Sequence, residues 1–458
     1  MNDTQMLRSS LQSKFSSRSM GVKLLIVCVL ALVMTIPALF VNGLVDDRTR
    51  SASDVVKEIS SHVGGQQTFL GPTLAIPYDI PSPSPAFNPK HGTYLVFPTQ
   101  GSATVKTRTE EKRRSLFKVP VFQADLNFEA AFDLNGVPVA APQGAVLDWP
   151  HAEFVIGVTD ARGALSDGSI TIGGKAIPLS PAQTAENFSV GPDATQQLKL
   201  KLFGARPGNV QPASHFTVTA VMRFSGAQRI ALLAYGKTTR LTMQGDWPDP
   251  SFDGGFLPVS HDISPNGFTA DWSVPFIARG VRAEGVGDTI SGLDATALGV
   301  SFVELADPYQ SVTRSLKYVL LFLGLLFLSY FVFEVTTGKR VHPAQYVLVG
   351  IAQIIFYLLL LSLAERIGFD FGFLIAGAAT VTLLSTNAGW IFASSAQTVR
   401  AFIVFTLLYT LIYLLLRLED NALLVGAVAS FLAVAGAMYF TRSIDWYGSL
   451  PDTATPNQ

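Results

Sequence analysis

Residues 334–369 read EVTTGKRVHPAQYVLVGIAQIIFYLLLLSLAERIGF, and this stretch decides the fold class of the chain. A basic turn, 339–343, precedes about 20 largely apolar residues, which is enough to cross a bilayer as a helix. The apolar run then closes on Glu365 and Arg366. Similar blocks crowd the last third of the chain, and one sits alone near the start. The sequence therefore predicts an integral membrane protein.

Six apolar segments are predicted to span the membrane, one N-terminal and five C-terminal. They are residues 21–45, 315–336, 344–364, 369–387, 400–416 and 421–440. We interpret the first as an uncleaved signal anchor, because its apolar core is long and 38–40 is a poor cleavage site. The single cysteine, Cys28, lies in this segment, so no intramolecular disulfide can form.

The basic residues predict the orientation of the spans. Lysines and arginines near span ends favour the cytoplasmic side. The N-terminal tail, 1–20, is basic, and Lys339, Arg340 and Arg400 occur without acids between them at alternate connections. The prediction is a membrane protein with both termini in the cytoplasm, including the tail 441–458. Residues 46–314 then lie on the outer side of the membrane.

The region between the first two spans has a different pattern. A helical stripe of Val55, Val56, Ile59 and Val63, stopped by 64–65, predicts a juxtamembrane helix. From about residue 93 to 306 polar and apolar residues alternate between frequent Gly and Pro turns, which predicts short antiparallel strands with one covered face. The expected fold class is thus six transmembrane helices with a large inserted all-β, sandwich-like outer domain within 46–314, and a five-helix bundle over 315–440.

Motifs for catalysis, cofactors or metals are absent or broken. Gly236-Lys237-Thr238 resembles the end of a phosphate-binding loop, but Ala231 stands where that loop needs glycine. Asp246, Asp249 and Asp253 lack the spacing of a calcium loop and predict a turn instead. A net charge of −1 argues against a nucleic-acid partner. We therefore expect no enzyme activity, no cofactor and no metal.

Polar residues in and beside the spans are the candidate functional residues, because an ionisable group inside a membrane is costly. We expect Glu334 to pair with Lys339 or Arg340, and Glu365 to pair with Arg366. Gln353, midway along its span, is expected to form a hydrogen bond between helices. An ion or proton pathway is the alternative reading of these residues. The candidates are Glu334, Lys339, Arg340, His342, Gln353 and Glu365.

Five stretches resemble the CreD family of inner-membrane proteins, also called cell-envelope integrity proteins. They are LGPTLAIP (70–77), GVTDARG (157–163), DWPDPSFDGGFLP (246–258), the block 331–365 and SIDWY (443–447). The resemblance implies a bacterial inner-membrane protein with one span, a large periplasmic domain, here residues 46–314, and a C-terminal span bundle. It also implies an association with envelope integrity, colicin tolerance and control by a two-component system. It supplies no catalytic residues.

Three hypotheses of function follow. In the first, the protein supports envelope integrity without catalysis, and its periplasmic domain is an interaction surface for envelope proteins or components. In the second, the C-terminal helices form a transporter or channel that uses Glu334, Gln353 and Glu365. In the third, the protein is a sensor that acts through the turn 339–342. The lipid bilayer is a partner in all three.

Overall fold

A computed structural model describes the chain in two compact units, residues 1–51 with 306–458, and residues 52–305. The described residues are 20–81, 90–114, 117–138, 141–184, 187–190, 198–208, 210–286, 292–302, 308–417 and 422–442. The basic tail up to residue 19, most of the PSPSP loop, SIDWY and the C-terminal tail after 442 lie outside them.

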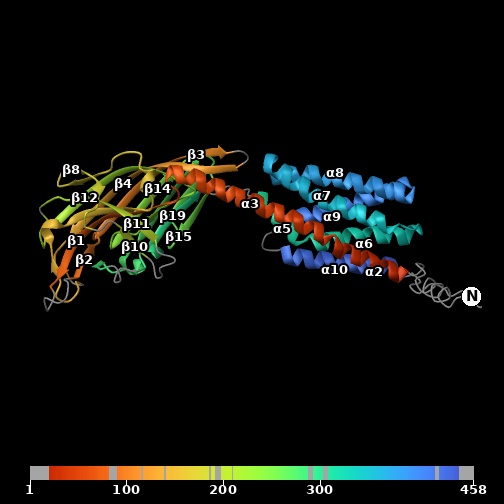
Figure 1. Ribbon diagram of the computed structural model, residues 1–458, viewed down its shortest axis with the longest axis horizontal. Coiled ribbons are helices and arrows are strands. Elements are labelled where there is room, and N and C mark those ends of the chain that lie inside the picture. Colours follow the sequence, from red (N-terminus) through yellow and green to blue (C-terminus); the bar gives the residue numbers. More distant parts are fainter. Residues whose placement is uncertain are drawn as a thin grey trace, which may run out of the picture. The chain divides into compact units, whose positions relative to one another are not determined.

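The first unit is helical, and its long helices run side by side (Figure 1). Among the described residues five helical stretches are long and apolar enough to cross a membrane: 21–63, α6, α7, α8 and α9. Helix α10 coincides with the sixth expected span, whose membrane crossing stays a prediction. The helices are α2 (Met20–Val33), α3 (Thr35–Val63), α5 (Pro308–Lys317), α6 (Val319–Thr337), α7 (Pro343–Ile367), α8 (Phe369–Phe392), α9 (Ser395–Arg417) and α10 (Ala422–Thr441).

The expected first span and juxtamembrane helix form one nearly continuous helical run. It is interrupted only at Met34, between α2 and α3. Pro37 explains the interruption, because proline has no amide hydrogen to donate to the preceding turn. The second span differs from its predicted bounds. The chain bends at Tyr318, so the apolar helix α6 begins at Val319 and the polar residues before it form the separate helix α5.

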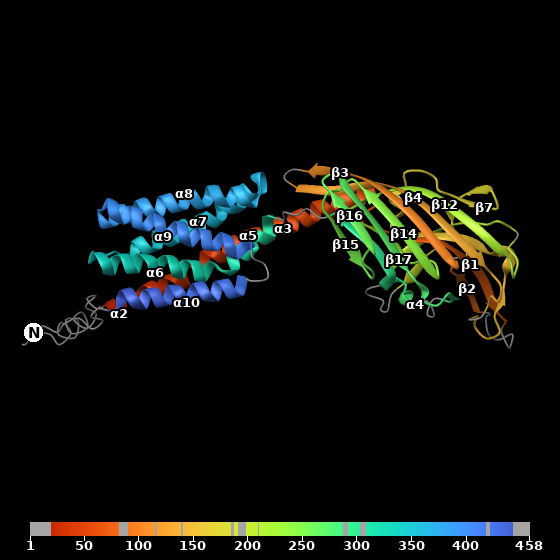
Figure 2. The ribbon, with the colours of Figure 1, turned by 180° about the vertical axis from the view of Figure 1, so that it is seen from behind.

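The second unit contains two β-sheets, counted over the described residues (Figure 2). In the eight-stranded sheet the order is β16 (Ser260–Ser264), β17 (Gly267–Val274), β14 (Thr238–Gly245), β3 (Gln100–Arg114), β4 (Phe117–Asp133), β12 (His215–Ala227), β7 (Ser169–Ile172) and β8 (Lys175–Pro178). The main path of the eleven-stranded sheet is β10 (Asn187–Val190), β11 (Leu198–Ala205), β6 (Glu153–Val158), β1 (Gln67–Ile80), β13 (Arg229–Leu233), β19 (Ala297–Phe302) and β15 (Pro250–Gly254). Strands β2 (Lys90–Val96), β5 (Val146–Leu147), β9 (Ser180–Pro181) and β18 (Glu284–Gly285) complete it. Short helices α4 (Phe276–Arg279), η1 (Trp149–His151), η2 (Ala161–Gly163) and η4 (Asp294–Thr296) lie between strands.

The two sheets enclose one apolar core, as the alternating pattern predicts. Phe69 on β1 packs edge-on against Phe224 on β12, with ring centroids 5.3 Å apart. Phe132 on β4 meets Phe154 on β6 in the same way, at 5.1 Å. The expectation of purely antiparallel strands is wrong at two pairs. Strands β1 and β13, and β3 and β14, pair in parallel, because long connections return the chain in the same direction.

Tyr235 is the polar centre of this core. Its side chain is fully buried, and its hydroxyl lies 2.7 Å from the carbonyl oxygen of Ser102 and 2.8 Å from that of Glu129. Gly71 and Gly101 flank the ring, and a Cβ on either would approach it to 2.6 or 2.8 Å. Glycine at these positions lets both sheets close on the tyrosine. Burial raises the pKa of Tyr235 well above its usual value.

Replacing Tyr235 with phenylalanine is expected to destabilise the β-domain by about 1–2 kcal/mol, because the buried hydrogen bond that the hydroxyl shares between two carbonyl oxygens is lost. The pH dependence should change as well. Since the folded-state pKa is raised, the wild type keeps this contribution below pH about 10 and loses it as the pH rises further. Thermal unfolding of the full chain at pH 8 and pH 11 checks both effects. An identical alkaline loss in the variant would refute the assignment to Tyr235.

Candidate functional site

Glu334 is a buried carboxylate near the end of α6. It is 1% exposed and forms an ion pair with Lys23 on α2, whose side chain is 18% exposed. It also accepts hydrogen bonds from the backbone amide of Val341 at 3.0 Å and from the hydroxyl of Tyr346 at 3.2 Å. A carboxylate in so apolar a place requires such compensation. The three contacts tie α2, α6 and α7 together.

The predicted pairing of Glu334 with Lys339 or Arg340 is wrong. Gly338 ends α6 with a left-handed backbone, φ 67°, and the following turn returns the amide of Val341 to the carboxylate. The Lys339 ammonium group instead donates to the carbonyl oxygen of Phe392, the last residue of α8. Arg340 is exposed.

His342 has a local role at the start of α7. It is the N-cap residue, and its Nδ1 accepts a hydrogen bond from the amide of Ala344 at 3.2 Å. Pro343 follows at the first helical position, where its missing amide hydrogen costs nothing. The geometry makes His342 a helix cap, which satisfies an amide that the helix itself leaves without an acceptor.

Gln353 lies in the middle of α7 and confirms the predicted contact between helices. It is 1% exposed, and its Oε1 accepts a hydrogen bond from the hydroxyl of Tyr409 on α9 at 2.6 Å. Its Nε2 and the hydroxyl of Tyr357, one turn further on, are also buried. Neither has a hydrogen-bond partner among the described residues. The Gln353–Tyr409 bond is thus the polar link between α7 and α9.

The two tyrosines around Gln353 offer a matched pair of substitutions. Tyr409→Phe should destabilise the helical unit by about 0.6–1.7 kcal/mol, because it removes an interhelical hydrogen bond. Tyr357→Phe removes a hydroxyl without a described partner and should be neutral or stabilising. Unfolding of the full chain by sodium dodecyl sulfate in mixed micelles measures the difference. Equal losses in the two variants would contradict it.

Glu365 joins three helices at the other end of α7. Its Oε1 accepts a hydrogen bond from the hydroxyl of Tyr309 on α5 at 3.1 Å and lies 3.8 Å from Nε of Arg48 on α3. The predicted pairing with Arg366 is wrong, because adjacent residues of a helix point in different directions. Arg366 is exposed. Glu365 therefore contacts residues of the neighbouring helices α3 and α5, and not a residue of its own helix.

Two charged residues of the helical unit were missed by the sequence interpretation. Lys23, at the start of the first apolar segment, forms the ion pair with Glu334. Asp370, in the first turn of α8, pairs with Arg417 at the end of α9 and accepts from the hydroxyl of Tyr413 at 3.0 Å. The signal for both was a charge inside or at the edge of an apolar block. Their partners could not be read from the sequence.

The outward face of the eight-stranded sheet is polar and carries an open hollow of about 500 Å³. Alternate residues of β3, β4, β14 and β17 point outward, and the register sets their side chains in rows. One such row crosses five strands and contains most of the charges of the hollow. It consists of Asp125, Lys106, Gln244, Thr269 and Asp262. We call this feature the polar hollow; its lining also includes Arg108, Asp246, Ser264 and Asn266.

Glycines give the polar hollow its depth. A Cβ on Gly245 would overlap Oγ1 of Thr107, and one on Gly267 would overlap the carbonyl oxygen of Gly245. Of the carboxylates, Asp125 is bound to Arg223 at 2.8 Å, and Asp246 accepts from the amide of Thr109 at 2.7 Å. The hollow thus offers both signs of charge and several amide and hydroxyl groups. Within the described residues no group of three or more His, Cys, Asp or Glu side chains could hold a metal ion.

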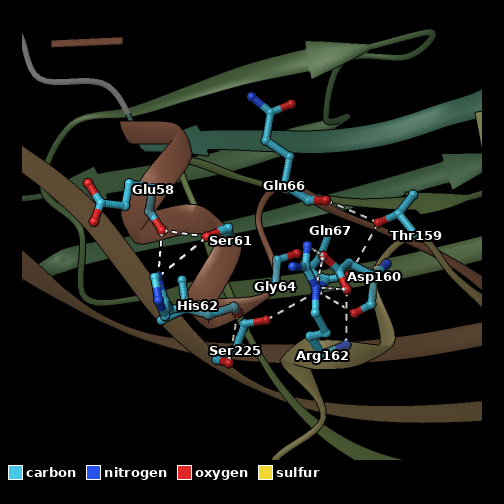
Figure 3. A network of polar contacts seen from close by, with 11 residues as sticks. Glu58, Ser61, His62, Gly64, Gln66, Gln67, Thr159, Asp160, Arg162 and Ser225 are labelled. Atoms are coloured by element: carbon cyan, nitrogen blue, oxygen red, sulfur yellow. Dashed lines mark hydrogen bonds and ion pairs between the residues drawn. The ribbon is translucent and has the colours of Figure 1, made fainter. Parts of the chain in front are cut away.

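The C-terminal end of α3 is fixed to both sheets, and this junction was not predicted (Figure 3). Val56, Ile59 and Val63 pack against a small apolar cluster on β4 and β12, which confirms the predicted stripe for these three residues. The helix ends at Gly64 and Gly65, both with left-handed backbones. The predicted stop is therefore confirmed as well.

Gln67 binds this junction together. It is fully buried, and its Nε2 donates to the carbonyl oxygens of Gly64 and Asp160, each at 2.9 Å. Its Oε1 accepts from the hydroxyl of Thr159 at 3.2 Å. Hydrogen bonds from Arg162 hold the pKa of Asp160 below its usual range. Thr159, Asp160 and Arg162 belong to the stretch GVTDARG, which thus has a structural role here.

Apolar helices that could cross a membrane, with a buried ion pair between α2 and α6, and a separate β-rich unit define an integral membrane protein with a large extramembrane domain. The chain belongs to the CreD family, because the family model described as "Inner membrane protein CreD" matches residues 19–447. It is similar to the inner membrane protein CreD of Escherichia coli (strain K12). The two are 29% identical over 432 residues, which cover 92% of each chain.

Proposed function

We propose that this inner-membrane protein supports the integrity of the cell envelope by binding, without catalysis, and that the β-domain is its interaction surface on the periplasmic side. The polar hollow is the observation that carries the proposal. It combines depth, both signs of charge and hydrogen-bonding groups on the outward face of a sheet. Such a surface suits a polar envelope component that carries both carboxylate and ammonium groups.

The distribution of basic residues supports the orientation. The N-terminal tail carries Arg8, Lys14 and Arg18, and the connection between α6 and α7 carries Lys339 and Arg340. Basic residues in short connections favour the cytoplasm. We propose on this basis that both termini are cytoplasmic, that six helices span the membrane and that the β-domain is periplasmic.

The buried polar groups of the helices give weaker support to transport. Glu334, Gln353 and Glu365 each contact residues of other helices, which is what helix packing requires. In the described part of the chain, the hydrogen-bond partner of Gln353 is the Tyr409 hydroxyl, and no carboxylate binds to it. We therefore place the function in the β-domain.

A charge reversal in the polar hollow tests the proposal. In a strain that lacks the protein, Lys106→Glu with Arg108→Glu should fail to restore the barrier against an impermeant dye and a detergent. Lys175→Glu is the matched control, since Lys175 is exposed on β8, the opposite edge strand of the same sheet. It should restore the barrier fully. Full restoration by the double variant, at equal protein levels in the membrane, would contradict the proposal.

A further inference from the structure

A second hollow lies in the helical unit, at the turn between α8 and α9. Its volume is about 320 Å³. Helix α8 ends at Phe392, Ala393 adopts a left-handed backbone with φ 46°, and α9 begins at Ser395. Hydroxyl groups and one indole dominate the lining: Thr386, Trp390, Ser394, Ser395 and Thr398. We call this feature the hydroxyl hollow.

A glycine shapes the hydroxyl hollow. A Cβ on Gly389 would overlap Oγ1 of Thr398, so only glycine at this position lets the first turn of α9 approach α8 so closely. The amide of Ser394 donates to the carbonyl oxygen of Gly389 at 3.3 Å and closes the turn. The hydroxyl groups are therefore held on a defined backbone between two long helices.

The hollow offers hydrogen-bond donors. Thr386 donates to the carbonyl oxygen of Thr382 at 2.8 Å and can only accept from a ligand. By contrast, the hydroxyls of Ser394 and Ser395 have no partner elsewhere in the described part of the chain. The first turn of α9 adds the positive end of a helix dipole. Acidic residues do not line the hollow. This combination favours an anion.

Lys339 supplies a full positive charge beside the hollow. Its ammonium group donates to the carbonyl oxygen of Phe392, and the next residue, Ala393, lines the hollow. An ammonium group has three hydrogens, so two stay available to a ligand. The predicted ion pair of Lys339 with Glu334 would have withdrawn this charge; in the structure Lys23 takes that place.

The surroundings of the hollow point to a lipid. Trp390 is 77% exposed at the end of an apolar helix, where indoles typically mark the membrane interface. Leu383 on α8 and Phe402 on α9 are 53% and 49% exposed. They add apolar surface one to two helical turns away from the hydroxyl hollow. We propose that the hydroxyl hollow binds the phosphate group of an anionic phospholipid, with Lys339 and the serine hydroxyls on the phosphate and the acyl chains along α8 and α9.

Binding of phosphatidylglycerol to the purified full chain tests this proposal. Native mass spectrometry from detergent gives the fraction bound as lipid is titrated, with phosphatidylcholine, a zwitterion of zero net charge, as the comparison. Lys339→Gln should weaken phosphatidylglycerol binding about fivefold, the effect of losing one positive charge near a lipid phosphate. The variant Ser394→Ala with Ser395→Ala keeps the charge and should also weaken it.

Arg340→Gln is the matched control, because Arg340 follows Lys339 directly and is exposed. It should leave binding within twofold of the wild type. Equal weakening by Lys339→Gln and Arg340→Gln would mean diffuse charge attraction and overturn the site. Displacement of the lipid by millimolar inorganic phosphate would show that free phosphate, and not a lipid, is the ligand. Unchanged helical circular dichroism in each variant excludes misfolding as the cause.

Discussion

Replacing Lys23 with methionine is expected to destabilise the helical unit by about 3 kcal/mol. The reason is the burial of Glu334, which is 1% exposed and would lose its counter-ion. Breaking a buried ion pair by removing one partner typically costs about 3–5 kcal/mol. We take the lower end because Lys23 retains 18% exposure. Unfolding of the full chain by sodium dodecyl sulfate in mixed micelles, followed by circular dichroism, measures the loss.

The double variant Lys23→Met with Glu334→Gln distinguishes this mechanism from simple loss of packing. It removes both charges together and should recover at least half of the loss, because replacing a whole buried pair is often nearly neutral. The amide still can accept from Val341. Arg340→Met, an exposed basic residue of the same unit, is the control and should change stability by less than about 0.5 kcal/mol. A loss below 1 kcal/mol for Lys23→Met alone would refute the buried pair.

Replacing Gln67 with leucine should destabilise the β-domain by about 3 kcal/mol. The substitution is close in size but leaves the buried carbonyl oxygen of Gly64 without a donor among the described residues and removes the bonds of Gln67 to Asp160 and Thr159. The unsatisfied carbonyl costs about 1–3 kcal/mol, and each of the other lost hydrogen bonds adds about 0.5–1.5 kcal/mol. Hydrogen exchange of the full chain, read from peptides of β1 and β12, measures the opening free energy.

Gln66→Leu is the matched control for this experiment. The Gln66 side chain is exposed and points away from the network, and only its backbone oxygen takes part, accepting from Thr159 at 3.0 Å (Figure 3). It should leave exchange of both strands unchanged. If Gln67→Leu also left them unchanged, the network would not stabilise the junction of α3 with the sheets.

Local patterns in the sequence predicted the elements well. The stripe of Val56, Ile59 and Val63 and the stop at 64–65 depend only on helical period and on the freedom of glycine. The alternation of polar and apolar residues predicted strands for a similar local reason, since successive side chains of a strand face the core and the solvent in turn. Gln353 followed from a comparable argument, because an amide in an apolar span needs a partner on another helix.

Contacts between distant parts of the chain could not be predicted. Lys23 and Glu334 are 311 positions apart, and the sequence offered nearer partners in Lys339 and Arg340. Proximity in sequence favoured the wrong pair. After the turn at Gly338, the Lys339 ammonium group donates to the carbonyl oxygen of Phe392 at the end of α8 and not to Glu334. The parallel pairs β1–β13 and β3–β14 and the polar hollow were likewise hidden, since alternation gives strands but not their neighbours.

The most direct measurement of the central claim is envelope permeability in a strain that lacks this protein. The strain is complemented either with the full chain or with residues 1–314, the first span and the β-domain alone, and challenged with an impermeant dye and a detergent. We predict that the anchored β-domain restores the barrier to most of the full-chain level. Restoration by the full chain only, with the anchored β-domain present at equal amounts, would contradict the account and place the function in the C-terminal helices.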